Sequence, residues 1–378
     1  GAQLDAAQQE AAELEKDFGA RRIGGTRDAV RALLENVPDK PVALLHFSGH
    51  GSFDAGAPGG SAVKLEQGAT LAVDEVGRRE VQLGRCCRTL VLFNYAEPPM
   101  ALDALIPEVQ AWLLARFPWV TAVVLKMRFA ADPARRRGVL IWGGQPATRI
   151  REHGVWYALD LRLNQDASFY LDTRHLRAWL KDNLGGKTVL NTFAYTGSLG
   201  AAALAGGARR VVQTDRSARF LALARQTYRL NGWPVEPQDF VVADFYRQTA
   251  AWRRQGVCFD GVILDPPFFA EDRSGRVDLQ NAYHRLINKV RPLVAHEGYL
   301  VAVNNALFLS GQAYLEMLQS LAEDAYLRLE ALIPVPEDVT GYPETRVSAP
   351  PADPAPFNHP TKIAILRVRR KNEVISPL

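Results

Sequence analysis

The segment from Lys187 to Asp215 constrains the fold more strongly than any other part of this 378-residue sequence. A short apolar run at 188–190 is followed by Thr196-Gly197-Ser198, residue types that form turns and cap helices. Small residues at 200–208 favour a helix that packs close to a sheet, and 211–215 reads as a second strand ending on an acidic residue. This strand-turn-helix-strand order predicts a parallel unit of a Rossmann-like, doubly wound α/β fold.

The turn in this unit indicates which ligand it can hold. It reads Phe193-Ala194-Tyr195-Thr196-Gly197, so the Gly-x-Gly-x-x-Gly fingerprint that cradles a pyrophosphate is absent. Asp215 ends the second strand, where an acidic residue binds a ribose diol in such folds. The turn therefore favours an adenosine cofactor without phosphates, namely S-adenosylmethionine. An ordinary strand-turn-helix of a parallel sheet remains the alternative on this stretch alone.

A second motif lies at Phe259–Phe269, where an apolar strand ends in Asp265-Pro266-Pro267-Phe268. Two prolines cannot continue a sheet, so the chain must turn outward at the carboxyl end of the strand, where ligands bind in open α/β sheets. Asp265 and the nearby carbonyls can accept hydrogen bonds from a base, and a phenylalanine can stack on it. Asp244, at the end of the preceding strand, is placed to accept from the adenine amine or, alternatively, to cap a helix.

Composition limits the class of protein. The sequence is 47% hydrophobic and 23% charged, and its net charge of +4 permits a nucleic-acid partner. No apolar run reaches membrane-spanning length and no signal peptide is evident, so we expect no membrane partner and a cytoplasmic location. The three cysteines, with Cys86 and Cys87 adjacent, give neither a disulfide framework nor a metal-site spacing. No metal is predicted, and the oligomeric state cannot be predicted.

The pattern divides the chain into three regions: 1–97, 98–164 and 165–378. The middle region is predicted to be a small α/β module, with a helix at 102–117 and strands at 120–126 and 138–142. The last region is predicted to form the doubly wound sheet, with strands at 188–191, 210–214, 240–243, 261–264, 299–304, 328–333 and 362–369.

Basic residues gather in the middle region, and a cluster of this kind can neutralise phosphates. A solvated loop is the equally open alternative. The predicted RNA-binding residues are Lys126, Arg128, Arg135, Arg136 and Arg137.

Residues 138–370, about 60% of the chain, resemble the bacterial class I S-adenosylmethionine-dependent methyltransferases of large-subunit ribosomal RNA, which make 5-methylcytosine or 7-methylguanine. The shared motifs are Phe-Tyr-Leu-Asp-Thr-Arg, Leu-Asn-Thr-Phe-Ala-Tyr-Thr-Gly-Ser, Thr-Asp-Arg-Ser, Leu-Asn-Gly, Asp-Pro-Pro-x-Phe and Asn-His-Pro. The sequence departs from the family at Phe268, where relatives have lysine.

The resemblance implies that the turn lines the methionine part of the cofactor, Asp215 the ribose and Asp244 the adenine, while Asp265 faces the reacting base. The implied cofactor-binding residues are Asp172, Arg174, Asn191, Phe193, Ala194, Tyr195, Thr196, Gly197, Asp215, Arg216, Ser217, Asp244 and Phe245. The implied catalytic residues are Asp265, Pro266, Pro267, Phe268 and Asn304.

One position separates the two groups of that family. The cytosine-C5 enzymes carry a cysteine after the fifth strand, because C5 becomes nucleophilic only after a thiolate adds to C6. Here the place reads Val303-Asn304-Asn305, as in the 7-methylguanine enzymes, and Cys258 lies before the fourth strand. Guanine N7 is already nucleophilic, so orientation and electrostatics suffice.

Residues 40–97 show a weaker resemblance to the caspase-like peptidase domains called CHAT, through Leu-Leu-His-Phe-Ser-Gly-His-Gly-Ser. His50 would match the catalytic histidine, but Ala96 stands where the family has its cysteine nucleophile. Without a thiolate no acyl-enzyme can form, so this region is predicted to be non-catalytic and to bind a protein partner.

The sequence thus predicts a methyltransferase acting on a base nitrogen of RNA, with guanine N7 of ribosomal RNA as the leading target. One alternative keeps the cofactor but uses a protein or small-molecule acceptor. Another is a non-catalytic interaction or regulatory protein with a degenerate peptidase-like region.

Overall fold

The computed structural model describes residues 51–52, 62–64, 70–71, 88–94, 106–267, 269–272, 275–323, 326–340 and 350–370. The chain divides into two compact units. The first comprises Gly1–Ala147, Leu161–Ala167 and Gly341–Val347, and the second comprises Thr148–Asp160, Ser168–Thr340 and Ser348–Leu378.

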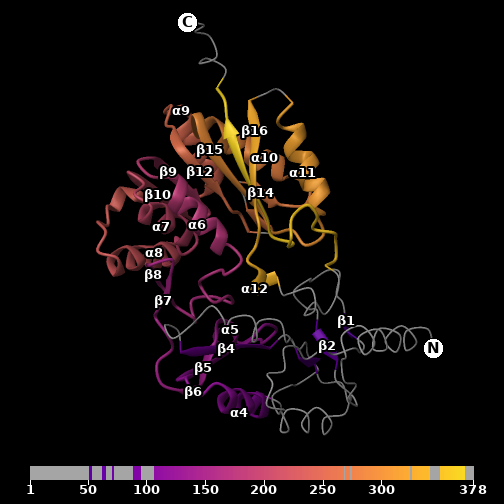
Figure 1. Cartoon of the computed structure of the whole chain (residues 1–378). Coiled ribbons are helices and arrows are strands. Elements are labelled where there is room, and N and C mark those ends of the chain that lie inside the picture. Colours follow the sequence, from indigo (N-terminus) through magenta and orange to yellow (C-terminus); the bar gives the residue numbers. More distant parts are fainter. Residues whose placement is uncertain are drawn as a thin grey trace, which may run out of the picture. The chain divides into compact units, whose positions relative to one another are not determined.

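A seven-stranded sheet forms the centre of the second unit (Figure 1), in the order β11-β10-β9-β12-β15-β17-β16. The strands are β9 (Thr188–Thr192), β10 (Arg210–Asp215), β11 (Phe240–Val242), β12 (Phe259–Leu264), β15 (Val294–Asn304), β16 (Leu327–Ile333) and β17 (Lys362–Val368). The first five in spatial order are parallel, and β17 runs antiparallel to both of its neighbours. All seven predicted strands and the predicted fold class are confirmed.

Helices cover both faces of this sheet because its central strands are apolar on both sides. Successive side chains of a strand point to opposite faces, so Val189 and Leu190 of β9 enter different hydrophobic clusters. Val189 packs with α6 (Arg174–Asn183) and α7 (Ser198–Ala205) on one face. Leu190 packs on the other face with α10 (Tyr283–Val290) and α11 (Gly311–Ser320). Each fully buried aliphatic side chain contributes about 1.5–3 kcal/mol to this packing.

Two short hairpins of the second unit were not predicted. The first joins β7 (Arg149–Glu152) to β8 (Val155–Ala158) through His153 and Gly154, which have φ angles of 48° and 82°. Positive φ at both turn residues is the geometry whose twist suits a two-residue hairpin. The second hairpin, β13 (Phe269–Asp272) and β14 (Gly275–Asp278), follows the Asp-Pro-Pro motif.

The first unit contains a three-stranded sheet in the order β4-β5-β6, with β4 and β5 parallel and β6 antiparallel. Its elements are β4 (Thr89–Asn94), α4 (Ile106–Arg116), β5 (Ala122–Met127), α5 (Pro133–Arg137) and β6 (Val139–Gly143). The predicted helix and strands of the middle region therefore form. Three short antiparallel strands, β1 (Gly51–Ser52), β2 (Ala62–Lys64) and β3 (Thr70–Leu71), make a separate sheet.

His50 and Ala96, on which the peptidase-like resemblance depends, lie outside the described residues, as does Phe268. Within the described part of the chain, no helix has both the length and the apolar character needed to cross a membrane.

Candidate active site

The carboxyl ends of the parallel strands bring the predicted polar residues to one edge of the sheet. Asp215 is the last residue of β10, Asp244 follows β11, and Asp265 follows β12. The turn that begins at Phe193 follows β9, which lies between β10 and β12. Asn304 ends β15 at the same edge. Five separate stretches of sequence therefore meet at the edge where ligands bind in open α/β sheets.

The turn after β9 has an unusual backbone. Phe193 and Tyr195 have φ angles of 50°, and Gly197 has a φ of 78°. Side chains other than glycine rarely adopt such angles, and strain of this kind concentrates at ligand sites. The turn is fixed by hydrogen bonds from the Ala194 N–H to the Thr214 carbonyl (2.9 Å) and from the Gly197 N–H to the Ala194 carbonyl (2.7 Å). The protein therefore holds the turn in one strained shape before any ligand arrives.

Asp215 is tied to this turn by its carboxylate. One oxygen accepts from the Tyr195 backbone N–H (2.9 Å) and the other from the Ser217 N–H (2.8 Å). Burial raises the pKa of Asp215, and these two hydrogen bonds offset part of that rise. Each carboxylate oxygen has a second lone pair. Asp215 can therefore still accept hydrogen bonds from the hydroxyls of a ribose, as its position predicted.

Asn191 supports the turn from within the sheet. Its Nδ2 donates to Oε1 of Gln213 (2.7 Å), and Nε2 of Gln213 donates to the Gly197 carbonyl (3.1 Å). The Oδ1 of Asn191 is buried and has no hydrogen-bond partner. Asn191 was predicted to bind the cofactor, and the structure shows it bracing the turn while leaving one acceptor unsatisfied.

Aromatic rings surround the turn. Phe193 stacks on Phe245 with ring centroids 4.5 Å apart. Tyr195 meets Phe220 edge-on at 4.7 Å and Tyr170 at 5.4 Å. These rings can pack against the apolar faces of an adenosine and a thioether.

Two of the predicted cofactor residues cap helices. Asp244 Oδ1 accepts from the Arg247 N–H (3.0 Å) at the start of α9 (Phe245–Arg254). Ser217 Oγ accepts from the Phe220 N–H (3.3 Å) at the start of α8 (Ala218–Leu230). The helix-cap alternative for Asp244 is confirmed, and its second oxygen can still face an adenine amine. Arg216 is exposed, and its charge lowers the pKa of Asp215.

The other side of the edge is built around Asp265. Its carboxyl accepts no hydrogen bond from the described residues, and burial together with the charge of Asp172 raises its pKa to about 7. Pro266 is buried and Pro267 is exposed, so the first proline anchors the loop and the second borders solvent. The raised pKa means that Asp265 keeps its proton to a higher pH than an ordinary aspartic acid.

Asp172 was predicted to bind the cofactor, and the structure places it beside Asp265. Its Oδ2 accepts from the Thr361 hydroxyl (2.9 Å), while its Oδ1 is buried without a partner. Thr361 precedes β17 and lies far away in the sequence, which is why the pairing could not be predicted. Two carboxyl groups in one site resist simultaneous ionisation.

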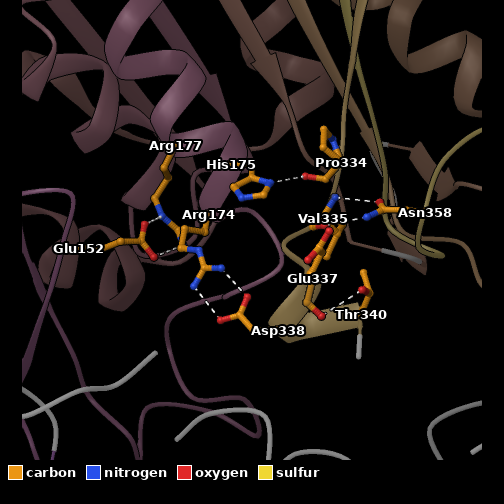
Figure 2. Close-up of polar contacts among 10 residues, drawn as sticks. All are labelled: Glu152, Arg174, His175, Arg177, Pro334, Val335, Glu337, Asp338, Thr340 and Asn358. Carbon is orange, nitrogen blue, oxygen red and sulfur yellow. Dashed lines mark hydrogen bonds and ion pairs between the residues drawn. The ribbon is translucent and has the colours of Figure 1, made fainter. Parts of the chain in front are cut away.

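Arg174 and Arg177 follow Asp172 in the chain, and their ion pairs with Asp338 and Glu152 are drawn in Figure 2. Arg174 forms a bidentate ion pair with Asp338, including an Nη1–Oδ2 contact of 2.9 Å, so its guanidinium is occupied within the protein. Arg177 is fully buried and pairs with Glu152 of β7 at 2.6 Å. It also donates to the Tyr170 carbonyl and the Thr173 hydroxyl, both at 2.8 Å.

Asn304 is fully buried, and its amide is used by the protein. Its Nδ2 donates to the Leu279 carbonyl and its Oδ1 accepts from the Ala306 N–H, each at 2.9 Å. The side chain therefore shapes the loop after β15. The neighbouring Asn305, which was not predicted, has a buried Oδ1 with no partner.

The predicted RNA-binding residues of the first unit differ in exposure. Arg128, Arg135 and Arg137 are exposed, and Arg136 is half-buried. Lys126 is buried, and its ammonium donates to the carbonyls of Arg137 and Asn164. We therefore remove Lys126 from the set, because a buried ammonium held by two carbonyls cannot reach a phosphate. The described residues contain no group of acidic, histidine or cysteine side chains that could hold a metal ion.

Comparison with known proteins identifies the fold family. A family model described as S-adenosylmethionine-dependent methyltransferase matches residues 100–339. Ribosomal RNA large subunit methyltransferase I of Photobacterium profundum is 34% identical over 197 residues, which is 52% of this chain and 50% of that protein. The protein of the same name from Aeromonas salmonicida is 34% identical over 178 residues, 47% of this chain and 44% of that one. The chain spans about half the length of these curated relatives.

Solved structures share the fold. The structure of SMU.776 complexed with SAH has a TM-score of 0.63 at 22% identity, and the match covers 74% of this chain and 70% of that one. An S-adenosylmethionine-dependent methyltransferase from Agrobacterium tumefaciens has a TM-score of 0.50 at 17% identity, covering 70% and 80%.

Proposed function

This chain belongs to the family of S-adenosylmethionine-dependent methyltransferases, and from that membership we propose that it methylates a base of RNA. The proposed substrate is ribosomal RNA, and the proposed acceptor is a ring or exocyclic nitrogen, with guanine N7 first. The names of the relatives support ribosomal RNA and specify no acceptor atom. The observation that carries the proposal is the arrangement of Asp215 and Asp265 on either side of the strained turn at 193–197.

The residues around the turn fit the cofactor. Asp215 has free lone pairs for a ribose diol, and Asn191 has a buried acceptor without a partner. Phe193, Tyr195 and Phe245 offer aromatic faces to the adenosine. When bound, S-adenosylmethionine supplies an electrophilic methyl group on a sulfonium. The turn at 193–197 would hold the methionine part of the cofactor in one position, because the backbone of the turn is already held by hydrogen bonds.

The carboxyl group of Asp265 supports guanine as the base. An ionised carboxylate accepts two hydrogen bonds side by side, and the Watson–Crick edge of guanine offers N1–H and an exocyclic N–H in that arrangement. N7 lies on the opposite edge of the base, where its lone pair is free. A base held in this way presents N7 without needing a proton acceptor, since no proton leaves N7 on methylation.

The cysteine content supports a nitrogen acceptor over carbon C5. Cys258 precedes β12 and Asp265 follows it, and a six-residue strand spans about 20 Å. The thiol of Cys258 accepts a hydrogen bond from Nη1 of Arg370 (2.9 Å) at that far end of the strand. At the acceptor edge itself the described residues present Asn304 and Asn305, which cannot add to a pyrimidine as a thiolate does.

The exposed arginines of the first unit, Arg128, Arg135 and Arg137, support RNA over a protein or small-molecule acceptor, because guanidinium groups bind phosphates. We also propose that residues 1–97 bind a protein partner and that the protein acts in the cytoplasm.

Nucleoside mapping tests the proposal. The full chain is incubated with methyl-labelled S-adenosylmethionine and large-subunit ribosomal RNA transcribed in vitro, and the digested nucleosides are examined by mass spectrometry. We expect labelled 7-methylguanosine, which disappears with Asp265→Asn. Labelled 5-methylcytidine would contradict the nitrogen assignment and keep the RNA assignment. Label found only in protein or in small molecules would contradict both.

A further inference from the structure

The exposed face of the β7–β8 hairpin carries two arginines and a tryptophan that the proposed function has not used. Arg149 and Arg151 are exposed and lie on the same side of β7, because side chains alternate along a strand. Trp156 of β8 is the cross-strand partner of Arg151. The two guanidinium carbons lie 4.6 Å and 5.6 Å from the centre of the Trp156 ring. We call these three residues the basic hairpin face.

Neither arginine has an acidic partner among the described residues, within which each guanidinium lies over the tryptophan ring. The nearest acidic residue in the strand, Glu152, points to the opposite face and is already paired with Arg177 at 2.6 Å. The two guanidinium groups over one ring repel each other, and a negatively charged ligand between them would reduce this repulsion.

The hairpin is held firmly enough to serve as a binding surface. On its opposite face Ile150 and Tyr157 are buried, and Tyr157 packs against Phe169 with ring centroids 5.0 Å apart. The Trp156 backbone exchanges two hydrogen bonds with the side chain of Asn231, at 2.9 Å and 2.7 Å. The face therefore loses little conformational entropy when it binds a ligand.

We propose that the basic hairpin face binds single-stranded RNA; the proposal rests on the proposed function, since it concerns the same substrate. Arg149 and Arg151 leave the Trp156 ring to contact successive phosphates, and a base stacks on the part of the ring that they uncover. Planar guanidinium groups bind phosphate oxygens bidentately, and every base has a face on which an indole can stack. A double helix would bury its bases and leave Trp156 without a partner, so the face prefers a single strand.

The same hairpin is linked to the part of the site around Asp172 and Asp265, which we call the acceptor side. Glu152 of β7 pairs with Arg177 (Figure 2). Arg177 also donates to the Tyr170 carbonyl and the Thr173 hydroxyl, on either side of Asp172. RNA bound on the hairpin is thus anchored to the element that also holds Asp172. The face thus positions the RNA, while Asp265 contacts the base.

Fluorescence anisotropy of the full chain with a labelled single-stranded RNA of about 12 nucleotides tests this assignment. Arg149→Ala with Arg151→Ala should weaken binding on the order of tenfold and lower the slope of log affinity against log salt by about 1.4, since two phosphate contacts are lost. Trp156→Ala should weaken binding at least about fivefold with an unchanged salt slope, and Trp156→Phe should restore most of it.

A matched control removes the same charge elsewhere. Arg253→Ala with Arg254→Ala deletes two exposed arginines at the end of α9, which lie over no aromatic ring of the described part of the chain, and should leave the affinity within about twofold. Equal affinity of the Arg149/Arg151 variant and the wild-type chain would overturn the proposal, as would an equal loss in the control. If the wild-type chain binds RNA and the hairpin variant binds it equally, the proposed function stands and only this assignment fails. If the wild-type chain binds no RNA, both fail.

Discussion

The carboxylates on the two sides of the site, the cofactor side around the turn at 193–197 and the acceptor side around Asp265, differ in their hydrogen bonding. On the cofactor side, Asp215 accepts two backbone hydrogen bonds and Asp244 caps a helix. On the acceptor side, Asp265 accepts none from the described residues, and Asp172 keeps one buried oxygen without a partner. Unpartnered amide oxygens occur on both sides, at Asn191 and Asn305, so the contrast lies in the charged groups.

The contrast shows what each side is built to do. Carboxylates that already accept hydrogen bonds are fixed in position and can add contacts to a ligand without moving. A buried carboxyl without donors is costly to ionise, and it gains most when a ligand brings N–H groups to it. The cofactor side is therefore a preorganised cradle, whereas the acceptor side is completed only by its substrate.

The largest expected effect comes from Asp265→Asn. An amide has a single acceptor oxygen and cannot accept two hydrogen bonds side by side from a base, so turnover should fall roughly 10²- to 10³-fold. Affinity for S-adenosylhomocysteine should remain within about twofold, because the cofactor side is intact. Single-turnover methylation rates and calorimetry check the two halves of this prediction. Near-normal turnover would show that Asp265 does not face the base.

The next effect concerns the strained turn. At Gly197 an added Cβ would lie 2.6 Å from the Cβ of Ala224, with a φ of 78°. Gly197→Ala should therefore destabilise the protein by about 1–3 kcal/mol and weaken cofactor binding. Gly232 has a φ of 71° but open space around it, so Gly232→Ala is the matched control with strain and no collision. Denaturant unfolding of both variants separates the cost of backbone strain from the cost of the collision with Ala224. Equal decreases in the free energy of unfolding would contradict the close approach of Gly197 to Ala224.

The pH dependence of methyl transfer gives a smaller, more specific effect. Asp265, whose pKa lies at about 7, faces Asp172 and Tyr283 and must be ionised to accept two hydrogen bonds. The rate should rise as pH increases through about 7. Asp172→Asn removes the opposing charge, so the midpoint should move to lower pH. A midpoint that stays in place would show that Asp172 does not influence Asp265.

The free energy of unfolding should change with pH in the opposite direction to the methylation rate. The pKa of Asp265 is raised in the folded protein, so the folded state binds its proton more tightly than the unfolded state, and this group's contribution to stability falls as pH rises from about 4 to 7. Asp265→Asn should therefore increase the melting temperature at pH 8 more than at pH 4. Equal shifts at both values would contradict the raised pKa.

The smallest effect is expected at Asp244. Its loss removes a helix cap, which costs about 1 kcal/mol of stability. If its second oxygen also contacts the adenine amine, Asp244→Ala weakens S-adenosylhomocysteine binding more than it lowers stability, whereas Asp244→Asn keeps the cap and loses only the charge.

The sequence predicted those parts of the site that depend on local order. The strands that end near the site, β10 and β12, contain apolar runs, and an acidic residue that follows such a run lies at the edge of the sheet, as Asp215 and Asp265 do. It did not predict contacts between distant segments. The Thr361 hydroxyl reaches Asp172 across 189 positions, and Arg174 reaches Asp338 across 164.

Burial and short strands account for the other differences between the sequence-based predictions and the structure. Lys126 belongs to a basic cluster in the sequence, yet its position in the inner strand β5 buries it, while Arg128, Arg135 and Arg137 follow the strand and are exposed. The β7–β8 hairpin has only four residues in each strand, too few for a clear alternation, although the His153-Gly154 dipeptide marks its turn.

Calorimetric titration with S-adenosylhomocysteine of the wild-type chain, Asp215→Ala and Asp265→Asn tests the division of the site most directly. We predict micromolar binding by the wild-type chain, a loss of about 1–3 kcal/mol in Asp215→Ala, and nearly unchanged binding by Asp265→Asn. No binding by the wild-type chain, or equal losses in the two variants, would contradict a site divided into a cofactor side and an acceptor side.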